Sequence, residues 1–240
     1  MIKPKKQQQK TFCGDSGFTI VESLVALLVA AILLAAITPV LVISTATRVQ
    51  ARRVELAAQA AKTFIDGIRS GAIAAPSQTI NIDASTDTNA RRIATVTVPT
   101  SVTGKPKDYL VENSTTDEMP VPTSATGLYC FTRSGTITTA DCTQKSFEYY
   151  IQAARMGVTG SSDNDGYRLA IRVYRADVDF TRPRTASTGQ SSKKTQNPYT
   201  GGLGDRQSPL LEMTTDIGNT STTFNDLCQR LGVATNKGCS

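Results

Sequence analysis

The sequence predicts an α+β protein in which a long N-terminal helix packs on an antiparallel β-sheet head. Two observations predict this fold class. An uncharged apolar run leads without a break into a one-sided helical pattern that reaches residue 70. After Gly71 the chain changes to short stretches in which apolar and polar residues alternate, as in strands with one buried face.

The apolar run, residues 23–47, has the length and composition of a transmembrane helix because it carries no charged side chain. At ~1.5 Å per residue it spans roughly 37 Å, more than the ~30 Å hydrocarbon core of a bilayer. The lysines that precede it are Lys3, Lys5, Lys6 and Lys10. Because positive residues stay on the cytoplasmic side, we expect one pass of the inner membrane, with the N-terminus cytoplasmic and the head periplasmic.

Two other interpretations of this N-terminal region fit less well. A cleavable secretory signal has a shorter apolar core, and residues 44–46, Ser-Thr-Ala, resemble its cleavage site only weakly. A lipoprotein signal places its apolar run before the modified cysteine, whereas here the run follows Cys13.

Residues 48–70 continue the helix with one apolar face, formed by Val54, Ala57, Ala61, Phe64 (or Ile65) and Ile68. Gly71 predicts the helix end. We therefore expect one helix of about fifty residues, bent at Pro39, which removes a backbone hydrogen bond.

Alternating patterns predict strands at residues 93–98, 128–131, 147–153 and 167–174. The last two are expected to form an antiparallel pair, with Tyr167, Leu169, Ile171 and Val173 on one face. Residues 163–166, Asp-Asn-Asp-Gly, lie between them and predict a turn. Calcium binding is the alternative for this segment, but the later ligands of a calcium loop are missing, so we expect no metal site.

Cys130, Cys142, Cys228 and Cys239 form an even set in the C-terminal part. In an oxidising compartment such a set indicates disulfides, and short loops favour Cys130–Cys142 and Cys228–Cys239 among three possible pairings. Free thiols are the alternative. Zinc is less favoured because the chain has no histidine and no C-x-x-C spacing.

Composition argues against an enzyme. Without histidine there is no Ser-His or Cys-His pair, and no phosphate-binding glycine loop is present, so we expect neither catalysis nor a cofactor. The formal net charge is +6, and half of it lies before Gly17, which argues against a nucleic-acid partner. Residues 181–209 form a basic polar loop, interpreted as a solvated surface or, alternatively, as a contact for an acidic polysaccharide, DNA or another partner.

The segment SGFTIVE, residues 16–22, resembles the processing site of type IV prepilins and of the pseudopilins of type II secretion systems. The resemblance implies that a prepilin peptidase cuts between Gly17 and Phe18 and methylates the new N-terminal Phe18. Glu22 and Pro39 stand where that family has its glutamate and its helix-bending proline. Here Ile20-Val21 replaces the commoner Leu-Ile, a conservative difference.

The resemblance implies a leader (1–17), a transmembrane helix (18–46), its amphipathic continuation (47–71) and a periplasmic head (72–240). It also implies assembly with other pilin-like subunits through the N-terminal helix, on an inner-membrane platform. A carboxylate in a bilayer is costly unless it is paired, and Glu22 can pair with the Phe18 amine of a neighbouring subunit. The alternative is a glutamate that reaches the headgroups at the membrane edge.

The apolar run and the helix that follows it further resemble pseudopilins for hormogonium polysaccharide secretion in filamentous cyanobacteria. We therefore expect a periplasmic pseudopilus-type filament that aids polysaccharide secretion linked to gliding motility. The rival functions are a minor subunit of a type IV pilus, for adhesion, motility or DNA uptake, and a membrane-tethered binding module that does not polymerise.

Overall fold

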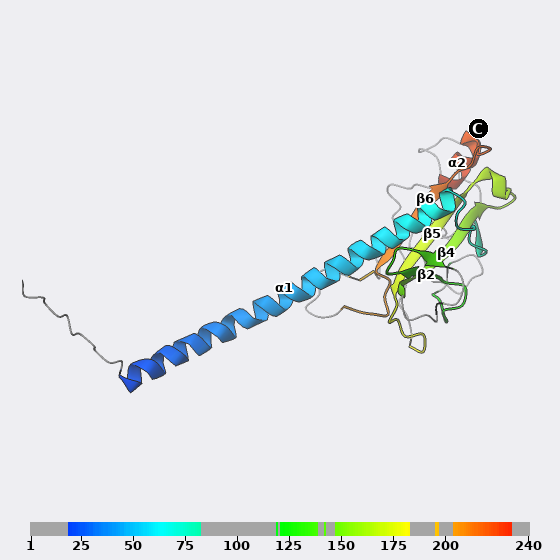
Figure 1. Cartoon of the computed structure of the whole chain (residues 1–240). Coiled ribbons are helices and arrows are strands. Elements are labelled where there is room, and N and C mark those ends of the chain that lie inside the picture. Colours follow the sequence, from blue (N-terminus) through cyan, green and yellow to red (C-terminus); the bar gives the residue numbers. More distant parts are fainter. Residues whose placement is uncertain are drawn as a thin grey trace, which may run out of the picture. The chain divides into compact units, whose positions relative to one another are not determined.

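The computed structural model describes residues 19–82, 119, 121–138, 142, 147–182, 195–196 and 204–231 (Figure 1). The elements follow in the order α1 (Ile20–Arg69), β1 (Thr79–Ile82), β2 (Tyr129–Thr132), β3 (Ile137–Thr138), β4 (Phe147–Val158), the 3-10 helix η1 (Asp163–Asp165), β5 (Tyr167–Arg175), β6 (Leu211–Ile217) and α2 (Phe224–Leu231). The chain divides into two compact units, Met1–Thr45 and Ala46–Ser240, which are described separately.

The helix α1 contains 50 residues, which confirms the expected length. It ends where the sequence predicts, because Gly71 adopts a left-handed conformation with φ of 74°. Beyond it the backbone N–H of Ile73 donates to the carbonyl oxygen of Gly67, 3.0 Å away. The absence of a side chain at Gly67 leaves room for Ile73, since a Cβ there would lie 2.4 Å from the Ile73 side chain.

The six-stranded sheet has the order β3-β2-β4-β5-β6, with β1 paired to β4 outside this path. The expected antiparallel pairing of β4 with β5 is confirmed, from Tyr149 opposite Arg175 to Met156 opposite Arg168. The strand β1 differs from the expectation, since it runs parallel to β4. The expected α+β fold class is therefore present, with one parallel edge segment.

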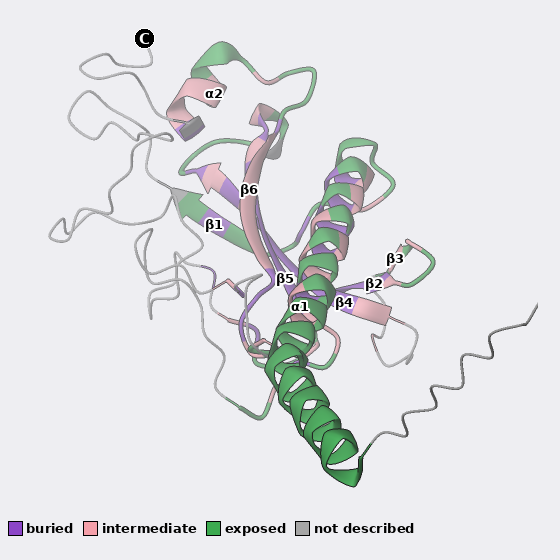
Figure 2. Ribbon diagram, turned by 90° about the vertical axis from the view of Figure 1, so that its left-hand side faces the viewer, coloured by how far each residue is buried: buried purple, intermediate pink, exposed green. Residues whose placement is uncertain are grey.

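One face of the sheet packs on the second half of α1 and forms the main core (Figure 2). Tyr167, Leu169, Ile171 and Val173 all lie in or against this core, as the alternation predicts. On the helix side the buried residues are Ala57, Ala60, Ala61, Phe64, Ile65 and Ile68. The three alanines permit a close approach of helix and sheet, and the ring of Phe64 meets Tyr129 edge-on with centroids 4.7 Å apart.

The opposite face of the sheet carries smaller apolar clusters and one buried polar row. Gln152, Arg172 and Glu212 are cross-strand neighbours on β4, β5 and β6. The Arg172 side chain is fully buried, and its Nε donates to Glu212 at 3.0 Å. Its Nη1 donates to the carbonyl oxygen of Met119 at 2.5 Å. These bonds compensate for the cost of burying a charge.

The connection between β4 and β5 is a turn, as expected, but it is a 3-10 helix rather than a two-residue hairpin turn. Ser162 caps η1, with Asn164 N–H donating to its hydroxyl, while the Asp165 carboxylate accepts from the Ser162 N–H. The predicted strand at 93–98 lies outside the described residues.

Candidate assembly helix

The first half of α1 exposes its whole surface. Every described residue of the unit Met1–Thr45 is exposed, including apolar side chains such as Ile20 and Leu34. Among the described residues, α1 is the only helix long and apolar enough to cross a membrane. A contiguous apolar surface of this extent indicates a membrane or protein interaction site.

Thr19 forms the N-terminal cap of α1. Its hydroxyl oxygen accepts a hydrogen bond from the backbone N–H of Glu22 at 3.3 Å, and its carbonyl oxygen accepts from the N–H of Ser23 at 3.1 Å. Glu22 lies in the first turn, where the helix dipole favours a negative charge. The predicted processing residues Gly17 and Phe18 lie outside the described residues.

Polar side chains within the apolar half bond to their own helix. Thr38 donates to the carbonyl oxygen of Leu34 at 2.6 Å, and Thr45 donates to that of Leu41 at 3.0 Å. Such bonds satisfy hydroxyl groups where water is excluded. The helix continues on both sides of Pro39, and the bend expected at this residue stays a prediction.

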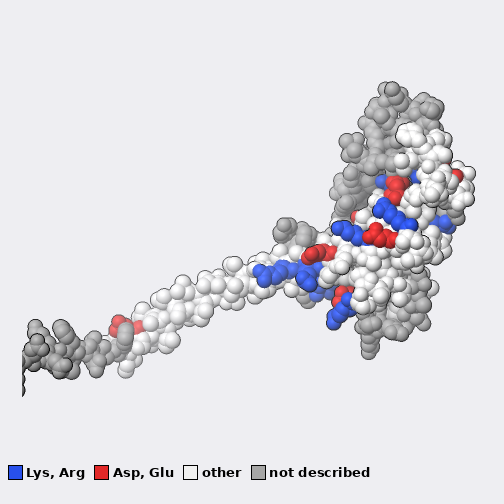
Figure 3. Space-filling model, turned by 45° about the horizontal axis from the view of Figure 1, so that its top comes forward, with Lys and Arg blue, Asp and Glu red and all other residues white. Residues whose placement is uncertain are grey.

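Within the described helix α1, positive side chains begin only after the apolar run. Arg48 and Arg52 are exposed on α1, and Arg53 is half-buried beside the sheet. On the face that Figure 3 shows, Lys and Arg side chains first gather on this second half of the helix. The hydroxyl of Tyr149 donates to the carbonyl oxygen of Arg53 at 3.4 Å. Burial and the neighbouring Glu148 raise the pKa of Tyr149, so this hydroxyl keeps its proton.

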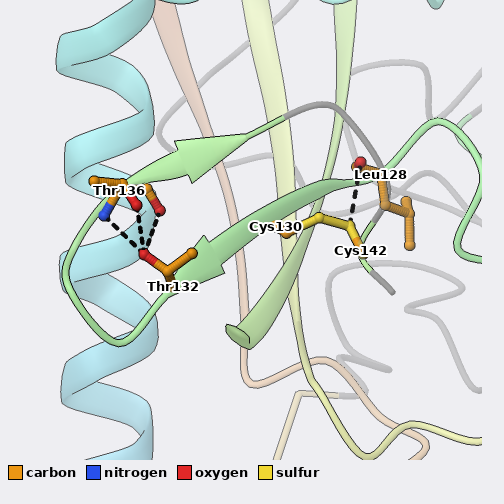
Figure 4. Close-up of a disulfide and its surroundings, with 5 residues drawn as sticks. All are labelled: Leu128, Cys130, Thr132, Thr136 and Cys142. Atoms are coloured by element: carbon orange, nitrogen blue, oxygen red, sulfur yellow. Dashed lines mark hydrogen bonds between the residues drawn. A yellow bond between two sulfur atoms is a disulfide. The ribbon is translucent and has the colours of Figure 1, made fainter. Parts of the chain in front are cut away.

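The predicted disulfide Cys130–Cys142 is present and joins β2 to the chain beyond β3 (Figure 4). The Sγ atom of Cys142 also lies 3.8 Å from the carbonyl oxygen of Leu128. A disulfide sulfur carries no hydrogen, so this is a packing contact. Cys228 is disulfide-bonded as well. Because Cys239 lies outside the described residues, its pairing with Cys228 stays a prediction.

The basic loop makes a buried contact that the sequence did not predict. Gln50 on α1 is buried, and its side-chain amide donates to Gln196 at 2.7 Å. Gln196 also donates to the carbonyl oxygen of Ser208 at 2.9 Å. The loop of residues 181–209 is therefore anchored to the helix through Gln196, which also bonds to Ser208 of the same loop, whereas the sequence predicted a solvated surface loop or a contact surface. No local signal distinguishes Gln196 from its polar neighbours.

Arg230 is a second buried group that the sequence did not predict. It extends from α2 and lies 3.5 Å from the carboxylate of Asp216 on β6, and its Nη1 donates to the carbonyl oxygen of Asp165 at 2.5 Å. Burial raises the pKa of Asp216, while the Arg168 and Arg230 guanidiniums act in the opposite direction. The arginine thereby holds α2 against the end of the sheet.

Within the described part of the chain, no group of three or more His, Cys, Asp or Glu side chains is arranged to hold a metal ion. No protein-family model, curated protein or solved structure matches the chain.

Proposed function

We propose that this chain is a pilin-like subunit of a periplasmic filament. A prepilin peptidase removes residues 1–17, and the mature chain starts at an N-methylated Phe18. The first half of α1 anchors the subunit in the inner membrane, with the N-terminus cytoplasmic and the head exported. Subunits then join through this helix on an inner-membrane assembly platform.

The observation that supports this proposal is the division of α1 into two halves with different surroundings. The second half is covered by the sheet of its own chain, whereas the first half exposes apolar side chains on every side. A helix that is apolar all round requires lipid or other apolar helices as neighbours. A filament built from such helices supplies those neighbours after the subunit leaves the membrane.

We further propose that the filament acts as a pseudopilus in polysaccharide secretion linked to gliding motility. This finer proposal is supported by a resemblance to pseudopilins for hormogonium polysaccharide secretion. The resemblance covers the segment FTIVESLVALLVAAILLAAITPVLV and the helix that follows it. Interaction with an acidic polysaccharide through the basic loop belongs to the same proposal.

Mass analysis of the N-terminus of the membrane-purified protein tests the proposal. We expect a chain that starts at Phe18 and carries one added methyl group. An intact Met1, or a start at Thr47 after conventional signal cleavage, contradicts the prepilin interpretation. A correctly processed chain that stays monomeric supports the membrane-tethered module instead.

A further inference from the structure

The edge of β4 is interrupted between two strands. On one edge β5 pairs continuously with residues 149–156. On the other edge β2 pairs as far as Ile151, opposite Tyr129, and β1 begins at Arg155, opposite Thr79. Residues 152–154 therefore have no strand neighbour on this edge among the described residues. Both β1 and β2 begin at the gap and run away from it.

A cavity of about 350 Å³ lies at this gap. Its walls come from the chain before β1, the chain before β2 with the first residue of β2, and the β4 edge between these two strands. Side-chain hydroxyl and amide groups in these walls belong to Ser77, Gln78, Thr123, Ser124, Thr126 and Gln152. None of the described residues that line the cavity carries a charge. Its volume lies within the range of small-molecule sites in proteins.

Backbone groups of β4 also face the cavity. The N–H of Arg155 donates to the carbonyl oxygen of Gln78 at 2.8 Å, so Arg155 directs its N–H toward the β1 edge. Backbone polar groups alternate along a strand, and the uninterrupted register with β5 excludes a bulge here. Ala153 therefore directs its own N–H and carbonyl oxygen into the gap.

The side chain of Gln152, one of the residues that line the cavity, is held by a buried hydrogen-bond network. The side-chain oxygen of Gln152 accepts a long hydrogen bond, 3.5 Å, from the buried guanidinium of Arg172. Arg172 is fixed in turn by Glu212 and by the carbonyl oxygen of Met119. This network orients the Gln152 amide before any ligand arrives, which lowers the entropy cost of binding.

We propose that this gap binds a neutral sugar residue of a glycan. The lining offers uncharged hydrogen-bond donors and acceptors, which suit a ligand with several hydroxyl groups. It also offers apolar surface to a sugar ring, from Leu128, Pro76 and Pro122. The gap from Ile151 to Arg155 measures roughly 13 Å at ~3.3 Å per residue and is closed at both ends by strands. An extended peptide therefore has one pairing position only, at Ala153, whereas a compact ring fits.

The proposal goes beyond filament assembly and does not depend on it. The test uses the purified full chain in a non-glycosidic detergent, with saturation-transfer NMR as the measurement of binding. The neutral probes are maltotriose, cellotriose and mannotriose, and trigalacturonic acid is the acidic probe. We expect at least one neutral trisaccharide to bind and the acidic one to bind at least tenfold more weakly.

Two variants locate the binding. Gln78→Ala removes a lining amide but keeps the backbone bond to Arg155, and we expect the dissociation constant to rise about tenfold. Ser77→Trp, at an exposed position, fills the cavity, and we expect binding to be lost. The matched control is Gln59→Ala, which removes an exposed amide on α1, outside the cavity, and is expected to bind as the wild type does.

Several outcomes overturn the proposal. These are no binding of any neutral trisaccharide, equal binding of trigalacturonic acid, or wild-type binding by both cavity variants. Displacement of a bound sugar is expected from the other neutral probes; displacement by an uncharged β-strand peptide instead assigns the gap to peptide binding. Since these measurements need neither processing nor filaments, their failure is distinct from that of the proposed function.

Discussion

Glu22 contributes to two separate features at the start of α1. Its backbone N–H donates to the Thr19 hydroxyl, so this bond forms whatever the side chain at position 22. Its side-chain carboxylate takes no part in that bond and is the group proposed to pair with the Phe18 amine of a neighbouring subunit. Substitution of the side chain can therefore remove the charge and keep the helix cap.

We expect Glu22→Gln and Glu22→Ala to be processed normally and to enter filaments about tenfold less well or worse, because an amine in the apolar filament core then lacks its partner. The processed fraction is measured by mass analysis, and assembly by the amount of protein in sheared filaments. Normal incorporation of Glu22→Gln contradicts the pairing argument. Thr19→Val, which removes the cap but keeps the carboxylate, separates the two contributions.

At Gly166 a side chain would meet backbone, and the conformation there also disfavours residues other than glycine. The φ of Gly166 is 79°, and a Cβ there would lie 2.6 Å from the carbonyl oxygen of Ile217 and 2.8 Å from the Thr222 hydroxyl. We expect Gly166→Ala to lower the free energy of unfolding by about 2–4 kcal/mol, from backbone strain and a clash with backbone that cannot move aside.

The control for this prediction lies in the same β4–β5 connection. Gly160 has a similar φ, 86°, but no atom within 4 Å of a built Cβ. Gly160→Ala should therefore show only the cost of the left-handed conformation, about 1 kcal/mol. Urea denaturation of the full chain in detergent measures both variants, and equal losses would mean that the contact with Ile217 is relieved.

At the scale of elements, the second half of α1 and the sheet are complementary in size. Small residues, Ala57, Ala60 and Ala61, lie on the helix, and larger ones, such as Ile151 and Leu169, lie on the strands. This combination brings the backbones close and fills the space between them. The helical period of the alanines is visible in the sequence, but their partners on the sheet depend on strand register.

The disulfide closes the β2–β3 region over a sequence separation of 12 residues. We expect Cys130→Ala together with Cys142→Ala to lower the free energy of unfolding by about 2–4 kcal/mol, mainly because the unfolded chain gains freedom. Thermal and urea denaturation of the unprocessed full chain measure the loss, and Cys13→Ala, before α1, is the control. Non-reducing peptide mapping should also recover a Cys228–Cys239 peptide; a free thiol at Cys228 would refute the second pairing.

At the scale of the whole molecule, stability should depend on pH through two carboxyl groups whose pKa values shift in opposite directions. Burial raises the pKa of Asp216 above 3.8, so its contribution is fully present below the unfolded pKa and is lost as the pH rises through the folded value. Hydrogen bonds from Thr223 lower the pKa of Asp226, so its contribution is present above the unfolded pKa and is lost as the pH falls.

Two substitutions separate these contributions. The difference in unfolding free energy, wild type minus Asp216→Asn, should decrease as the pH rises from 3 to 6. The same difference for Asp226→Asn should increase over this range. Chemical denaturation at several pH values measures both, and slopes of the same sign would contradict the assignment of burial as the dominant cause at Asp216.

The two units of the chain also differ in what stabilises them. The unit Ala46–Ser240 buries its own core, whereas the described residues of Met1–Thr45 bury none of their side chains. The apolar side chains of the N-terminal unit must therefore be covered by something other than their own chain. We infer that detergent, lipid or neighbouring helices must cover them at every stage of the proposed pathway.

The sequence by itself determined the features that depend on near neighbours in the chain. The bounds of α1 follow from side-chain period and Gly71, the β4–β5 pair from alternation around a polar turn, and Cys130–Cys142 from a short loop. Only the tertiary structure decided the parallel β1, the Gln50–Gln196 bond, the Arg230 contacts and the gap in the β4 edge. These features join residues far apart in the sequence, and their energies depend on burial and register, which no local pattern encodes.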